Sequence, residues 1–376
     1  MKGIKDIIVK GSIFAVLTAV FCMGGVPAVP LVSTAHAEVI WSEDMTFNES
    51  TTMSDGVRLS KDTTLTVAEG KTLTINSSIN CNSNTLTIAG PGTVTVIGES
   101  DLPGIFQGEK VTLESGTLNV TGNNGGIAAT SYVTITGGTL NVTVEGSGAG
   151  IGVDENFTIT GGTVTVTGGD NGNGISVGGN FTITGGTVTS AGGNGGSGIS
   201  VGRNFALEGG TLTSTGDEGV REPFGEVSAI IIANGIAYTD GTNIYSGDID
   251  NSETMQALNG KTLTPCAAAI DRVYYITIQE ALDAADGKTV KLLRDVKTTS
   301  PLTVSKTLTL NLNGHTIDRG LSGETGDGNS SGSVIKIGSN GNLTLSDNSI
   351  DQTGLITGGY ADNGGGVRVR VVVFSQ

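Results

Sequence analysis

The feature that most constrains this chain is an eight-residue motif that returns at a fixed interval. It reads Val133-Thr-Ile-Thr-Gly-Gly-Thr-Leu140 and returns with small changes from Phe157, Phe181 and Phe205, each start 24 residues after the last. A second marker, an isoleucine at positions 127, 151, 175 and 199, keeps the same step. A fixed period of this size indicates supersecondary units that stack on one another.

Each repeat contains three short runs in which apolar and polar residues alternate. In one repeat the runs are Phe157–Thr160, Thr163–Thr167 and Ile175–Val177. Side chains alternate between the two faces of a strand, so phenylalanine, isoleucine and valine share one interior while threonine and serine face out. Glycine-rich segments between the runs suit tight corners, and no run has a helical period. The chain is therefore predicted to be all-β, a parallel β-helix (solenoid) with about 24 residues per rung.

The first 37 residues have the pattern of a secretory signal peptide. Three lysines precede an apolar run over Ile13–Val26, and Ala35-His-Ala37 supplies small residues before a cleavage point at Glu38. The alternative is a membrane anchor, but the run is short for a span and is interrupted by Gly24, Gly25 and Pro27. We expect a secreted or cell-surface protein, with no membrane span in the mature chain.

Changes in the repeat pattern divide the mature chain into three parts. Residues 38–216 are predicted to form a first β-helix with the 24-residue repeats, in which the rungs before about 110 are less regular. Trp41 and Phe47 are expected to cover its first rung, since a solenoid end otherwise exposes the core. Residues 217–271 lack the repeat and are predicted to be an irregular connector or a small β subdomain. Residues 272–376 are predicted to start a second β-helix, capped by a helix.

The helix of the third part is predicted from its capping signals. Thr277-Ile-Gln-Glu280 is a capping box, and Gly287 supplies the C-terminal stop. Ile278, Ala281, Leu282 and Ala285 fall on one helical face. The segment TIQEALDAADGKTVKLLRDV, followed by LTLNLNGHTI, resembles the helix-capped start of a right-handed parallel β-helix of the pectate-lyase-like (pectin lyase-like) superfamily.

Two further segments resemble parts of bacterial exported proteins. GLITGGYADNGGGV is similar to rungs of large bacterial surface proteins of the same superfamily, and the Thr/Gly repeats resemble modules labelled carbohydrate-binding. The resemblance implies a right-handed β-helix in two consecutive segments, on a bacterial surface protein. Members that cleave acidic polysaccharides use clustered carboxylates, often with calcium, but no position here matches such a set. We therefore assign no catalytic, cofactor-binding or metal-binding residue, and no cofactor.

Composition excludes some partners and leaves few candidate catalytic groups. The formal net charge is −16, which argues against nucleic acid and anionic membranes because both are bound through basic patches. The mature chain has a single histidine, His315, so a two-histidine zinc site is excluded. We interpret His315 as a corner residue that hydrogen-bonds the backbone. Asp154, Glu155 and Asp170 are expected in corners.

Two sets of repeated polar residues have both a structural and a binding interpretation. Asn156, Asn180 and Asn204 recur once per rung, and we favour an asparagine ladder over a polar binding strip because asparagine suits left-handed corners. The Thr-x-Thr rows also resemble the hydroxyl lattice of ice-binding solenoids, although threonine is an ordinary strand residue. Cys81 and Cys266 are expected to be free thiols, since about seven rungs, each about 4.8 Å high, would separate them.

Two functional hypotheses follow. The first is a non-enzymatic exported or cell-surface protein that acts as a rigid stalk or adhesin, with surface or host glycans as expected partners. Few aromatic residues support sugar stacking, since Trp41 is the only tryptophan. The alternative is a polysaccharide lyase or hydrolase of the pectate-lyase-like superfamily. No capping element follows the strand pattern of Val367–Phe374, so we expect a shortened chain that self-associates through its open last rung.

Overall fold

The computed structural model describes most of the chain, in two compact units. The described residues are 38–99, 101–217, 223–321, 332–360 and 367–369. The predicted signal peptide, residues 1–37, lies outside them. Unit 1 comprises the chain up to Ile231 together with Ile249–Thr262, and unit 2 comprises Ile232–Asp248 and the chain from Leu263 onwards. Each unit is described by itself.

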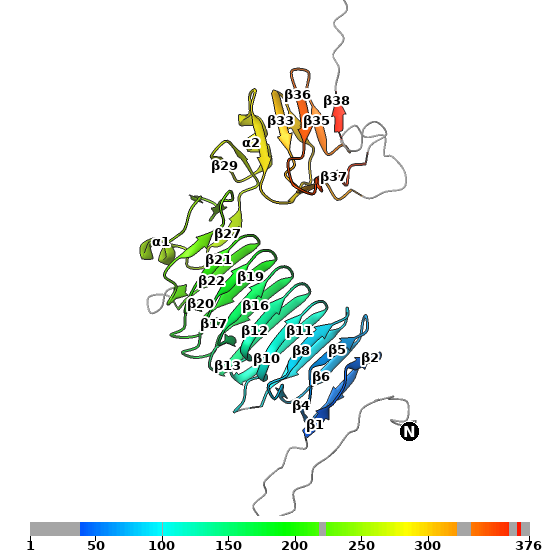
Figure 1. The fold of residues 1–376 in the computed structure, drawn as a ribbon, viewed down its shortest axis with the longest axis vertical. Helices are drawn as coiled ribbons and strands as arrows, with labels where there is room; N and C mark the ends of the chain where they lie inside the picture. The colour runs from blue at the N-terminus through cyan, green and yellow to red at the C-terminus, as the bar shows by residue number, and fades with distance from the viewer. Residues whose placement is uncertain (1–37, 100, 218–222, 322–331, 361–366, 370–376) are drawn as a thin grey trace, which may run out of the picture. The chain divides into compact units, whose positions relative to one another are not determined.

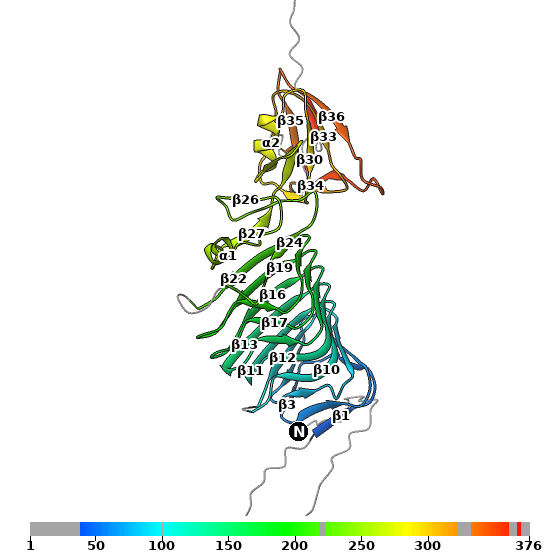
Figure 2. The same ribbon diagram turned by 60° about the vertical axis from the view of Figure 1, so that its left-hand side comes forward.

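Unit 1 is a parallel β-solenoid whose regular rungs contain three strands each. One rung consists of β15 (Asn156–Ile159), β16 (Thr163–Thr167) and β17 (Ile175–Val177), and the next of β18 (Phe181–Ile183), β19 (Thr187–Ala191) and β20 (Ile199–Val201). Each strand pairs in parallel with its counterpart one rung on (Figures 1 and 2). Over both units, the described part of the chain is only 4% helix and forms a β-solenoid of about 11 turns at a spacing of about 24 residues, which confirms the predicted fold.

The remaining strands continue this stack in both directions. Before the regular rungs come β1 (Glu38–Trp41), β2 (Met45–Phe47), β3 (Thr51–Met53), β4 (Gly56–Leu59), β5 (Thr63–Val67), β6 (Thr72–Ile75), β7 (Ile79–Asn80), β8 (Thr85–Ala89), β9 (Thr93–Ile97), β10 (Ile105–Leu113), β11 (Thr117–Asn124), β12 (Ile127–Ile135), β13 (Thr139–Ser147) and β14 (Ile151–Val153). After them come β21 (Phe205–Leu207), β22 (Thr211–Thr215), β23 (Phe224–Gly225), β24 (Ile230–Ile232) and the short helix α1 (Ser252–Ala257).

The core of unit 1 consists of columns of apolar side chains stacked in register. Phe157, Phe181 and Phe205 are fully buried, and consecutive ring centroids lie 4.9 and 5.0 Å apart. The predicted shared interior is therefore confirmed, and within it the three rings form one stacked aromatic row. On the first described rung, Trp41 is buried and its ring lies 6.4 Å from that of Phe47, so the two side chains pack against each other.

Glycines are required in unit 1 for two different reasons. Gly162, in the corner after β15, has a φ of 79°, a left-handed conformation that residues with a Cβ adopt at a cost. Gly150 has no such φ, but a Cβ there would overlap Val166 Cγ1 and lie 2.7 Å from the Gly174 carbonyl oxygen. Gly150 therefore permits a close approach between neighbouring rungs.

The asparagine ladder is confirmed, but the reason given for it is wrong. Asn180 N and Nδ2 each donate to Asn156 Oδ1 at 3.0 Å, and Asn204 Nδ2 donates to Asn180 Oδ1 at 3.1 Å. None of the three asparagines has a positive φ. The side chains are held by hydrogen bonds between rungs, because parallel in-register pairing places each amide against the next.

Unit 2 begins with short antiparallel strands and continues as a second parallel stack. Its elements are β25 (Tyr238–Thr239), β26 (Ile244–Tyr245), β27 (Thr262–Pro265), β28 (Ala268–Ile270), β29 (Val273–Tyr275), α2 (Ile278–Ala284), β30 (Thr289–Leu292), β31 (Val296–Lys297), β32 (Leu302–Val304), β33 (Thr307–Asn311), β34 (Thr316–Asp318), β35 (Ile335–Ile337), β36 (Asn342–Ser346), β37 (Leu355–Thr357) and β38 (Val367–Val369). Three parallel series, β30-β33-β36, β31-β34-β37 and β32-β35-β38, form the second β-helical segment.

The predicted helix cap and part of the predicted last strand are confirmed. Thr277 Oγ1 accepts from Glu280 N at 3.2 Å, and Glu280 Oε2 accepts from Thr277 N at 3.0 Å. Ile278, Ala281 and Leu282 are buried in the core of unit 2. β38 pairs with β35, and the rest of the predicted Val367–Phe374 strand lies outside the described residues.

Both described cysteines are free and buried, as expected. Cys81 lies in unit 1 and Cys266 in unit 2. Burial raises the pKa of the Cys81 thiol to about 12 and also raises that of Cys266. Neither helix of the described residues is long and apolar enough to cross a membrane.

Candidate functional site

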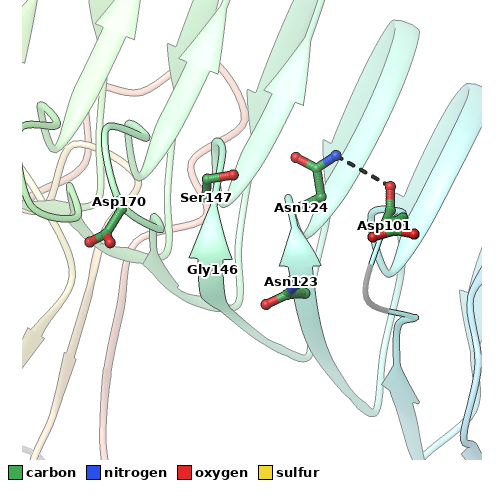
Figure 3. A pocket seen from close by; sticks show the side chains of 6 residues that line it. All are labelled: Asp101, Asn123, Asn124, Gly146, Ser147 and Asp170. Atoms are coloured by element: carbon green, nitrogen blue, oxygen red, sulfur yellow. Dashed lines mark hydrogen bonds between the residues drawn. The ribbon is translucent and has the colours of Figure 1, made fainter.

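An open polar groove of about 410 Å³ lies on unit 1, at the corner that follows the strands of one sheet (Figure 3). Its lining residues are Asp101, Asn123, Asn124, Gly146, Ser147 and Asp170. β11 and β13 reach this corner because they are 8 and 9 residues long, whereas β16 has 5. The groove is therefore built where two longer strands extend past the regular length.

The pairing between rungs brings four polar residues into one row. Asn124 is the register partner of Ser147, and an isolated bridge pairs Ser147 with Asp170. Asn124 Nδ2 donates to the Asp101 carbonyl oxygen at 3.3 Å, as Figure 3 shows. Four consecutive rungs thus contribute one residue each. At about 4.8 Å per rung, the row is about 14 Å long.

The strict 24-residue period gives the wrong neighbour for Asp170. Counting back 24 positions leads to Gly146, whereas the structure pairs Asp170 with Ser147. The reason is one extra residue in β13 before Ser147. The offset to the next rung is 24 at Thr143 and Thr167 but 23 at Ser147 and Asp170, and the same extra residue shifts the register of β13 against β11 after Gly122. A search for polar residues at a step of 23, the separation of Asp101 and Asn124, would have found the whole row.

The floor of the groove is open because it contains a glycine. A Cβ at Gly146 would overlap the carbonyl oxygen of Asn123 and lie 2.5 Å from its Oδ1. The backbone of Gly146 is also fixed, since its carbonyl oxygen accepts from Asp170 N at 2.7 Å. A side chain at this position would displace the Asn123 amide and fill the space between the rungs.

The side chains of the row suit a ligand rich in hydroxyl groups. Asp101, Asn124, Ser147 and Asp170 are all exposed, and they offer two carboxylates, one amide and one hydroxyl. These groups both donate and accept hydrogen bonds. Within the part of the chain that the structure describes, no group of three or more His, Cys, Asp or Glu side chains is arranged to hold a metal ion.

The other candidate residues from the sequence lie elsewhere. Asp154 and Glu155 are exposed in the corner between β14 and β15, and do not line the groove. His315 is in unit 2, where its Nδ1 lies 3.4 Å from Asp295 Oδ1. Its backbone N donates to the Leu312 carbonyl oxygen at 2.9 Å, so it is a corner residue as expected. The expected backbone contact of its side chain is replaced by a carboxylate contact.

The sequence did not identify Asp101, Asn124 or Ser147 as site residues. Neither Asn124 nor Ser147 occupies a position of the eight-residue motif, and Asp101 precedes the regular repeats. Their shared row depends on the pairing of β11 with β13.

Comparison with known proteins gives one match. The family described as carbohydrate-binding domain-containing protein matches residues 31–266, which include the regular rungs and the groove. No curated protein and no solved structure matches the chain. Since the match covers more than half of the sequence, the chain belongs to the family of carbohydrate-binding domain-containing proteins.

Proposed function

We propose that unit 1 binds an extended, neutral glycan along the groove. The observation that carries this proposal is the row formed by Asp101, Asn124, Ser147 and Asp170, in a chain of a carbohydrate-binding family. A linear sugar chain presents hydroxyl groups at regular intervals, and the row presents one polar residue per rung. The ligand lies parallel to the stacking direction and contacts several rungs.

Charge favours a neutral glycan over an acidic one. Asp101 and Asp170 place carboxylates in the groove, and the whole chain carries a formal net charge of −16. A uronic-acid polymer would be repelled by both. Each hydrogen bond contributes about 1 kcal/mol net, so several sugar units must be engaged at once for useful affinity.

We further propose that the protein is exported and acts at the cell surface as a non-enzymatic stalk or adhesin. The support is the signal-like pattern of residues 1–37 together with the repetitive β-helical turns of the two units. In this role the solenoid carries the groove, and binding to surface or host glycans holds the protein in place.

The test compares two matched variants on an array of neutral and acidic linear glycans. Asp170→Asn and Asn124→Ala together are expected to weaken binding roughly 30-fold, the loss of about two hydrogen bonds. Asp250→Asn makes the same Asp→Asn change at an exposed position of unit 1 that does not line the groove, and is expected to bind like the unmodified protein. Circular dichroism checks that each variant keeps its strands.

Two outcomes contradict this proposal. The first is that the unmodified protein binds no neutral glycan, and the second is that Asp250→Asn weakens binding as much as the groove variants. The bound glycans are also analysed for cleavage. New reducing ends or unsaturated products would favour the alternative of a polysaccharide lyase or hydrolase.

A further inference from the structure

Tyr132 is an exposed aromatic ring on the outer side of unit 1. Its side chain is 45% exposed, more than any other aromatic residue in the described part of the chain. It belongs to β12 and lies at the corner where the later rungs carry asparagine. The later rungs place only a small amide at this position, so the exposed ring of Tyr132 contributes little to the core. The ring is therefore available to a ligand.

The register places Tyr132 between a cation and the start of the asparagine ladder. Lys110 is its partner on the preceding rung, and Asn156 is its partner on the following one. Neighbouring parallel strands lie about 4.8 Å apart, so the three residues form one short row. Thr134 and Thr158, two positions further along these strands, are partners in the adjacent outward row.

The first amide of the ladder has unused donors beside this ring. Asn156 Oδ1 accepts both hydrogen bonds from Asn180, at 3.0 Å each. Each Nδ2 higher in the ladder donates toward the preceding rung, and for Asn156 the preceding rung carries Tyr132. Among the described residues, Asn156 Nδ2 has no hydrogen-bond partner, and it is not a buried atom.

The chemistry of this corner matches one face and one edge of a sugar ring. An aromatic face packs against apolar C–H groups, while amide and hydroxyl groups bind the hydroxyls at the edge of the sugar. Pyranoses of the β-gluco configuration have axial ring C–H bonds, and therefore offer an apolar face. Exposed carboxylates precede two members of the row in the sequence, Glu109 before Lys110, and Asp154 and Glu155 before Asn156. These negative charges disfavour an acidic sugar.

We propose that Tyr132, Asn156 and Lys110 form a second sugar-binding site, which takes a neutral β-gluco-configured pyranose on the Tyr132 ring. This inference rests on the proposed carbohydrate binding. Along the chain, the groove residue Asn124 precedes and Tyr132 follows the segment Ile127–Ala129 of β12, so the groove and this site are separate.

The experiment titrates the full chain with cellotetraose and laminaritetraose, with trigalacturonate as the acidic probe. Calorimetry gives the affinity, and saturation-transfer NMR shows which sugar protons contact an aromatic ring. Tyr132→Asn is the main variant, because asparagine occupies this position in the next three rungs and the fold accepts it. Tyr132→Phe keeps the ring and removes the hydroxyl.

We expect Tyr132→Asn to weaken binding of a neutral tetrasaccharide about tenfold and to abolish the aromatic contact. Tyr132→Phe is expected to keep both. Unchanged affinity and unchanged NMR contacts in Tyr132→Asn would overturn the inference.

The groove variant Asp170→Asn separates this inference from the proposed function. If Asp170→Asn weakens binding and Tyr132→Asn does not, the second site is wrong and the groove stands. If only Tyr132→Asn weakens binding, the second site stands and the groove assignment is wrong. If neither tetrasaccharide binds the unmodified protein, both proposals fail for this sugar class.

Discussion

At the scale of single residues, the environment of a side chain in unit 1 is made largely by its own copies on the neighbouring rungs. Phe181 lies between Phe157 and Phe205, and the amide of Asn180 lies between two other amides. Side chains that face inward are therefore packed between their copies on the two neighbouring rungs. Side chains that face outward contact only their copies on those rungs, with water on the other sides.

The first prediction compares two neighbouring residues on β18. Phe181→Ala is expected to lower the free energy of unfolding by about 3–5 kcal/mol, because it removes a fully buried ring between two others. Thr182→Ala, which faces out, is expected to change it by no more than about 0.5 kcal/mol. Urea unfolding followed by circular dichroism measures both. Equal losses would show that the two faces are assigned wrongly.

The second prediction concerns two glycines separated by one residue. Gly150→Ala is expected to cost about 1–3 kcal/mol or more, because its Cβ overlaps Val166 and approaches the Gly174 carbonyl. At Gly152 the nearest atom to a Cβ, the Ile127 carbonyl oxygen, is 4.0 Å away. Gly152→Ala is therefore expected to be neutral or to stabilise by about 0.5 kcal/mol, since glycine is costly in a strand. The opposite order in urea unfolding would contradict the packing of the rungs.

At the scale of elements, corners that lack the regular repeat are held by side-chain hydrogen bonds. In unit 2, Asp347 follows β36 and accepts from Gly314 N at 2.9 Å, Gly354 N at 2.6 Å, Ser349 N at 3.0 Å and Ser349 Oγ at 2.7 Å. One carboxylate thus ties the loop after β33 to the loop before β37. Burial alone raises the pKa of Asp347, but these hydrogen bonds outweigh it and lower the pKa to about 2.

The third prediction is the pH dependence of this loop pair. The pKa of Asp347 is lower in the folded state than its ordinary value of about 3.9, so the carboxylate stabilises the fold above about pH 4. This contribution is lost as the pH falls through about 2. Asp347→Asn is therefore expected to open the loops at pH 6, seen as faster amide exchange at Gly314 and Gly354.

The difference between Asp347→Asn and the unmodified protein is expected to shrink toward pH 2, where Asp347 is also protonated. Asp351→Asn is the matched control, because Asp351 is exposed in the same loop. A difference between Asp347→Asn and the unmodified protein that stays constant from pH 6 to pH 2 would contradict the role of the charge.

At the scale of the whole molecule, the last described strands of unit 2 carry exposed apolar side chains. Leu345 on β36 is 44% exposed, whereas its register partner Leu310 on β33 is fully buried. Leu355 on β37 is also exposed. A column of apolar side chains whose last members are exposed to water favours association with another apolar surface.

The fourth prediction is that the chain self-associates through these strands, as expected from the sequence. Leu345→Lys is expected to shift the protein toward monomer in sedimentation velocity, because a charge at the end of the core opposes contact with a second copy. Leu102→Lys, at an exposed leucine of unit 1, is the control and is expected to have no effect. A wild-type protein that is monomeric at every concentration, or equal effects of the two variants, would count against it.

The sequence by itself determined the fold class, the rung length and the side of each strand that is buried. These features are local: strand alternation assigns Phe157 and Thr158 to opposite faces, and glycine pairs mark the corners. The 24-residue period predicts the stacking between rungs, because residues at equal spacing pair with their own copies on the next rung. For the same reason the aromatic row, the asparagine ladder and the capping box at Thr277 could all be predicted.

Only the tertiary structure decided which residues form the groove. Asp170 meets Ser147 instead of Gly146 because β13 contains one extra residue before Ser147, which shifts its register against both neighbouring rungs. Register between rungs is set by hydrogen bonds between segments distant in the sequence, and a slip of one residue changes every partner beyond it. The exposure of Tyr132 likewise depends on what its neighbouring rungs carry. The periodic core could be read from the sequence, whereas the sites lie where the period is broken.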